Sequence, residues 1–183
     1  MLLSLLCSAA PAVMQGQGRA PAPADVTFIT GMIAHHAQAV EMVALVPART
    51  TRRELRLIAE RIDVSQRDEM AWMRQWLADH GGAPTADHGA HDHAAMGHAS
   101  MPRMLSPDEM AAMARATGPD FERRFLEGMI RHHEGALTMV ATLLGSQDAA
   151  QRSEIFAFAS DVDADQRAEI ARMRRVLAAL PPR

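Results

Sequence analysis

The chain has 183 residues and a formal net charge of −3, and 48% of its residues are hydrophobic, which suits one packed domain or two small halves that share a core. Aromatic residues make up only 4%, so the core must consist mainly of Leu, Ile, Val, Ala and Met. The charge balance, with no basic run, gives no support to nucleic-acid binding, and the single Cys7 excludes an internal disulfide framework and a cysteine-based zinc site.

Residues 1–13 form a short apolar run followed by small residues, which resembles a secretory signal with a weak basic region. The run is too short to cross a bilayer, so we expect no transmembrane helix in the mature chain. We expect export to the periplasm, the cell envelope or the medium, and a lipid anchor at Cys7 stays open although the preceding residues fit poorly. Residues 14–24 are rich in Gly, Pro and Ala and are predicted to form a flexible leader.

Apolar periodicity and capping residues predict an all-α chain with no strand. Asp25 and Asp120 are expected N-caps, Pro47 is expected to end the first helix, and Ser106 to Glu109 form a capping box. Residues 80–105 have no periodicity and are predicted to be a linker. The expected helices are, in chain order, 26–46, 51–79, 107–116, 121–144 and 149–180.

Two stretches of the chain repeat the same element. Residues 28–43 (FITGMIAHHAQAVEMV) align with 125–140 (FLEGMIRHHEGALTMV) at an offset of 97, and 62–77 align with 162–177 at an offset of 100. A helical hairpin is thus duplicated, and neither copy can bury its apolar face alone. We predict one four-helix bundle over residues 25–180, made of repeat 1 (25–79), the linker (80–105) and repeat 2 (106–180), with a short extra helix.

The repeats carry the same polar and thioether residues toward the predicted core. At about 100° per residue, Met32, His35 and Met42 share one stripe, with His36 on its flank. Gln66 and Met73 face inward on the next helix, with Glu69 beside them. The complete set of candidate ligands is Met32, His35, His36, Met42, Gln66, Glu69 and Met73 in repeat 1, and Met129, His132, His133, Met139, Gln166, Glu169 and Met173 in repeat 2.

Each of these residues alone has an ordinary structural explanation, because methionine fills core gaps and a buried histidine is often simply hydrogen-bonded. Their duplication as a set favours metal binding. Thioethers are poor ligands for Zn, Mn and Mg and good ligands for Cu(I) and Ag(I), while imidazole suits both copper oxidation states. Neither His-His helix carries the Glu-x-x-His pattern of di-iron bundles. We therefore predict copper ions, with Cu(I) preferred, Cu(II) accepted and Ag(I) as a surrogate.

The linker is also rich in histidine and methionine. It is predicted either to be a polar spacer or to carry weaker sites that capture cations for the bundle. These candidate residues are His88, His91, His93, Met96, His98, Met101 and Met104.

Three segments carry a family resemblance: FITGMIAHHAQAVEMV, IDVSQRDEMAWM and MLSPDEMAAMARATGPDFERRFLEGMIRHHEGALTMV. Through them the chain resembles the DUF305 family over nearly all of Asp25 to Leu180. The resemblance implies a ferritin-like four-helix bundle, usually exported or lipid-anchored in bacteria, of which some members bind copper or silver and support metal tolerance. By position, this chain's copies of the family pattern are Met32, His35, His36, Met42, Met129, His132, His133 and Met139. Ile170 stands where repeat 1 has Met70, so the halves need not bind equally.

We expect an exported protein that buffers or sequesters metal without catalysis, with one site carried by each repeat and an affinity that falls as pH drops through the histidine range. Two alternatives stay open: a redox-active bundle such as a cuprous oxidase, and a metal-free structural or interaction module. A homodimer and a copper-transporter partner are also left open.

Overall fold

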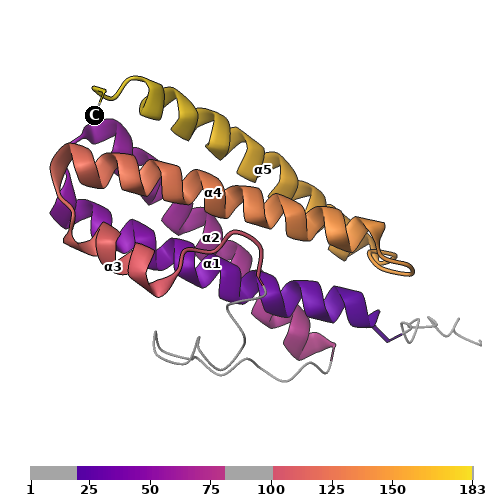
Figure 1. Cartoon of the computed structure of the whole chain (residues 1–183). Helices are drawn as coiled ribbons and strands as arrows, with labels where there is room; N and C mark the ends of the chain where they lie inside the picture. Colours follow the sequence, from indigo (N-terminus) through magenta and orange to yellow (C-terminus); the bar gives the residue numbers. More distant parts are fainter. Residues whose placement is uncertain (1–19, 81–100, 183) are drawn as a thin grey trace, which may run out of the picture.

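The computed structural model describes residues 20–80 and 101–182, and within these ranges the chain is all-α, as predicted. The signal-like segment, most of the leader and the linker residues His88, His91, His93, Met96 and His98 lie outside the described residues. Five helices follow one another along the chain (Figure 1): α1 (Pro23–Arg49), α2 (Arg53–Asp79), α3 (Pro107–Arg115), α4 (Gly118–Gly145) and α5 (Ser153–Ala178).

The four long helices form the predicted ferritin-like bundle (Figure 1). α1 packs antiparallel against α2, α4 packs antiparallel against α5, and the two hairpins meet mainly where α1 lies along α4. The short helix α3 packs on α4. The His-His segments lie on α1 and α4, so this arrangement brings the equivalent parts of the two repeats into the contact between the hairpins.

Three predicted helix ends are wrong by a few residues. α1 continues past Pro47 to Arg49, because a proline in the last turn removes few helical hydrogen bonds. Its N-cap is Ala22, and the expected cap Asp25 lies in the first turn, where its buried carboxylate accepts a 2.7 Å hydrogen bond from the Ala150 amide. Similarly, Thr117 precedes α4, and Asp120 lies within its first turn.

The last helix also begins later than predicted. The expected start was residue 149, whereas α5 begins at Ser153. Asp148 and Ala150 adopt positive φ angles of 59° and 51°, which a right-handed helix does not accommodate. The hydrogen bond from the Ala150 amide to the Asp25 carboxylate holds this loop against the start of α1.

The end of the predicted linker is ordered against the bundle. We call residues 101–105 the strap; it crosses between α1 and α4 on the way to α3 (Figure 1). The Leu105 side chain is buried, and the amide and carbonyl of Leu105 both bond to the buried side chain of Gln38, at 2.8 and 2.9 Å. The capping box at Ser106 then starts α3, as predicted. Residues 101–105 of the predicted linker 80–105 are non-helical and lie against the bundle.

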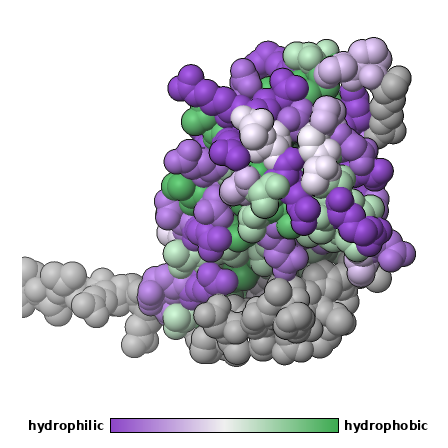
Figure 2. All heavy atoms as spheres, turned by 90° about the vertical axis from the view of Figure 1, so that its left-hand side faces the viewer, coloured by the Kyte–Doolittle hydropathy of each residue, from purple (hydrophilic) through white to green (hydrophobic). Residues whose placement is uncertain are grey.

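Only α1, among the described helices, is long and apolar enough to meet the criteria for a membrane span. Just over half of its apolar stretch, 56%, is buried inside the bundle, and the buried residues of α1 include Asp25, His35 and Gln38. Burial against the other helices accounts for the apolar composition of α1. Hydrophilic side chains cover most of one end of the bundle, with apolar ones scattered between them (Figure 2).

Candidate metal centre

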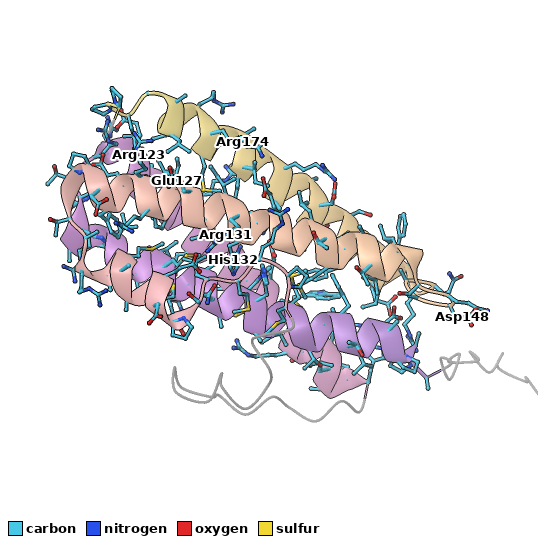
Figure 3. All side chains as sticks on the ribbon, viewed as in Figure 1. Arg123, Glu127, Arg131, His132, Asp148 and Arg174 are labelled. Atoms are coloured by element: carbon cyan, nitrogen blue, oxygen red, sulfur yellow. The ribbon has the colours of Figure 1, made fainter. Side chains whose placement is uncertain are left out.

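Four histidines meet in the middle of the bundle. His35, His36, His132 and His133 are all fully buried, and His132 lies midway along α4 (Figure 3). The rings of His35 and His132, at equivalent positions of the two repeats, lie against each other with centroids 3.8 Å apart. The contact between α1 and α4 thus places the predicted ligands of both repeats in one centre.

Two of these histidines are held by carboxylates of the partner helix in each hairpin. His36 donates from Nε2 to Glu69 at 2.6 Å, and His133 donates from Nε2 to Glu169 at 2.7 Å. The same pairing occurs in both repeats. Glu69 was predicted as a ligand together with its equivalent Glu169, and in the structure both carboxylates orient an imidazole.

The other two histidines are held by main-chain carbonyls. His132 donates from Nε2 to the His35 carbonyl at 2.9 Å, and His35 donates from Nε2 to the Pro102 carbonyl of the strap at 3.2 Å. Since a carbonyl or carboxylate oxygen can only accept, Nε2 carries the proton in all four rings. In the neutral ring Nδ1 then carries the lone pair. All four Nδ1 atoms are buried, and none has a hydrogen-bond partner within residues 20–80 and 101–182.

The predicted methionine ligands gather into two equivalent groups. Met32 and Met73 pack in one apolar cluster with the half-buried Met139, whereas Met129, Met173 and Met42 pack in the other. Five of these six side chains are fully buried. Each group takes two methionines from one repeat and the third from the other, because α1 and α4 run antiparallel. The two clusters thus mix methionines of both repeats, whereas the sequence predicts one set of ligands in each repeat.

The glutamines at equivalent positions of α2 and α5 are also buried, as predicted. Gln66 and Gln166 are each 1% exposed. Both amide atoms of Gln66 and the Oε1 atom of Gln166 have no hydrogen-bond partner among the described residues. A buried polar group without a partner costs about 1–3 kcal/mol, so these positions favour a polar ligand in the core.

Burial disfavours protonation of His35 and His132. Desolvation, reinforced by the nearby His36, lowers the pKa of His35 to about 3. Desolvation and the neighbouring histidines also lower the pKa of His132 well below its usual value. In the folded protein the neutral form of both rings is therefore favoured below the ordinary histidine range. The expected fall in metal affinity through the ordinary histidine range does not apply to these two rings in the folded protein.

Nitrogen and carboxylate groups alone do not form a ready-made site. Across residues 20–80 and 101–182, no group of three or more His, Cys, Asp or Glu side chains has the geometry to hold a metal ion. The strap methionines Met101 and Met104 are half-buried beside the bundle. The groups in the core that could bind a soft metal ion are the Nδ1 lone pairs of the four histidines and the thioethers of the buried methionines.

The family model described as a domain of unknown function, DUF305, matches residues 25–177. The chain belongs to the DUF305 family. A DUF305 fragment from Deinococcus radiodurans is 34% identical, with a TM-score of 0.74 over 88% of this chain and 100% of that one. A DUF305 protein from Streptomyces coelicolor, whose name describes it as secreted, is 28% identical, with a TM-score of 0.72 over 85% of this chain and 93% of that one.

Another structure similar to this DUF305 chain is that of CopM in a Cu(I)-bound form. It is 25% identical, with a TM-score of 0.66 over 85% of this chain and 96% of that one. The Cu(II)-bound form of CopM is 26% identical over the same share of this chain. No curated protein sequence matches the chain.

The His–Glu pairs of this DUF305 protein allow the first prediction. Replacing Glu69 with Gln keeps a hydrogen-bond acceptor for His36 but removes the negative charge that orients the imidazole and raises its basicity as a ligand. We expect Cu(I) affinity to fall about tenfold with the fold intact, since such partners of metal-binding histidines contribute about 10–100-fold. Competition with a Cu(I) chelator measures the affinity. The matched Asp63→Asn variant, at an exposed pair with Arg67, should bind as wild type; equal affinities in all three proteins contradict the assignment.

Proposed function

We propose that this protein is exported and binds Cu(I), with Ag(I) as a surrogate, at the centre of its bundle, and that it buffers or sequesters the metal without catalysis. The observation that carries the proposal is the set of four buried Nδ1 atoms that lack a hydrogen-bond partner. Each ring is fixed through Nε2 by an oxygen acceptor, which is how metal-binding histidines are usually held.

The choice of metal rests on the other donors. The methionines around the histidines supply thioether sulfur, which favours Cu(I) and Ag(I) over Zn(II). CopM, a protein of the same fold, is known with bound Cu(I), Cu(II) and Ag. The Streptomyces relative described as secreted supports export. Outside the cytoplasm, methionine also has the advantage that it forms no disulfides in an oxidising environment.

Two other functions remain as rivals with distinct results. A metal-free structural module would show no stoichiometric Cu(I) binding when titrated against a competing chelator. A redox enzyme would consume oxygen catalytically when Cu(I) is supplied in excess. Our proposal expects stoichiometric binding and no turnover.

Metal selectivity gives the second prediction. Protein loaded with Cu(I) under anaerobic conditions should retain it in about a hundredfold excess of Zn(II), because sulfur ligands discriminate strongly between these ions. Equilibrium dialysis followed by metal analysis measures the retained copper. Displacement of the Cu(I) by Zn(II) would show that the thioethers do not contribute, and would leave the copper proposal without its chemical basis.

A further inference from the structure

The strap meets the metal centre directly. In the described part of the chain, it is the one non-helical segment that hydrogen-bonds to a histidine of the centre, through the Pro102 carbonyl and His35 Nε2. The four histidines have no exposed surface, so a metal ion cannot reach their free nitrogens unless some part of the protein moves.

Two residues of the long helices hold the strap in place. Gln38 of α1 makes two buried hydrogen bonds to the Leu105 main chain. Gly135 of α4 makes room for Pro102: a Cβ atom there would lie 2.2 Å from the Pro102 carbonyl oxygen and 2.9 Å from His35 Nε2. An exposed ion pair at 2.9 Å between Arg103 and Glu134 adds a third attachment.

Gln38 and Gly135 occupy equivalent positions in the two repeats. Gln38 and Gly135 align at the offset of 97, within segments that otherwise keep the same His, His and Met residues. Among the described residues one strap crosses between α1 and α4, so the two copies of this position have different contacts with it. One binds the strap through an amide, and the other lacks a side chain where the strap comes closest.

We propose that the strap is the gate through which metal reaches and leaves the His35–His132 pair, and that Gln38 and Gly135 determine how often it opens. The inference rests on the proposed copper function and adds a rate control to it.

Opening the strap is the least costly route to the centre. Separating α1 from α4 would expose core residues such as Met32 and Met129, which are fully buried. Lifting the strap breaks the two bonds to Gln38, the 3.2 Å contact to His35 and one exposed ion pair, and withdraws the Leu105 side chain. Segments held by few contacts open locally far more often than the core unfolds. Once the strap is open, His35 Nε2 loses its bond to the Pro102 carbonyl and the ring is no longer covered by the strap.

The experiment compares Cu(I) exchange in wild type and in Gln38→Leu. The substitution keeps the side-chain size and removes both bonds to the strap, so we expect Cu(I) to be captured and released about tenfold faster, with the equilibrium affinity unchanged. Stopped-flow transfer to a colorimetric Cu(I) chelator measures release. Amide exchange at Leu105 in the apo protein should rise by a similar factor, since its N–H loses its acceptor.

A matched control is Gln75→Leu, which removes an exposed side-chain bond to Asp79 far from the strap and should leave both rates unchanged. Arg103→Ala tests the gate without touching the core and should speed release about twofold. If Cu(I) release is unchanged in Gln38→Leu although the Leu105 amide exchanges faster, the metal takes another route. If Gln38→Leu does not fold, unchanged Cu(I) release in Arg103→Ala overturns the gate. If wild type binds no Cu(I), the proposed function fails and the gate with it.

Discussion

The metal-free protein is expected to lose about 2 kcal/mol of unfolding free energy between pH 7.5 and pH 5 through His35 alone. The pKa of His35 is lowered from 6.5 to about 3 in the folded state, so below pH 6.5 the unfolded chain binds a proton that the folded protein does not. Stability is therefore complete above pH 6.5 and decreases as pH falls toward 3. His132 contributes in the same direction.

Urea unfolding at a series of pH values measures this effect. His35→Leu should flatten the dependence, because the buried ring that resists protonation is gone. His80→Leu, which removes a histidine stacked on Trp76 outside the centre, should keep the pH dependence that His35 contributes. Saturation with Ag(I) should stabilise the folded protein at pH 5, since the metal binds the neutral rings that only the folded state offers. A free energy of unfolding that stays constant from pH 7.5 to pH 5 would contradict the assigned burial of these rings.

The second large effect concerns the metal itself. The double variant His35→Leu/His36→Leu should weaken Cu(I) binding about a hundredfold or more while keeping its helical content, because two ring nitrogens are replaced by apolar groups in an apolar setting. The loss should extend to the other repeat. The His35 ring lies against His132, and Met42 belongs to the same cluster as Met129.

Chelator competition measures the Cu(I) affinity, and circular dichroism measures the helical content. His80→Leu is again the control, expected to bind with the affinity of wild type. Two independent sites, each confined to one repeat, would instead leave half of the tight binding intact in the double variant. Full high-affinity binding in the double variant would make the His-His pair purely structural.

Periodicity in the sequence predicts the architecture and the burial of most candidate ligands on the helices. The helical stripes predict that His35, Met32 and Met42 point into the core, and all three side chains are fully buried. This works because helix geometry is local: the angle between successive residues decides which face a side chain occupies. The duplicated pattern also predicts the equivalence of His36 and His133, each of which bonds to a glutamate at a matching position.

The grouping of ligands could not be predicted, because it depends on how the two hairpins dock. Sequence spacing assigns Met42 to repeat 1, and only the antiparallel contact of α1 with α4 brings it to Met129. The strap was missed for a related reason. Its position depends on distant residues of α1 and α4, chiefly the Gln38 amide and the space left by Gly135, and neither produces a periodic signal in residues 101–105. The difference between Gln38 and Gly135 at equivalent positions of the two repeats is the sequence feature that points to the strap.

The measurement that tests the central claim most directly is a titration with Ag(I), followed by the ring-nitrogen chemical shifts of the histidines in ¹⁵N-labelled protein. We expect the first equivalents of Ag(I) to shift Nδ1 of His35, His36, His132 and His133, while Nε2 stays protonated and bonded to its present acceptor. Unchanged Nδ1 shifts in these four rings at saturating Ag(I), with changes confined to histidines elsewhere in the chain, would contradict a metal site at the centre of the bundle.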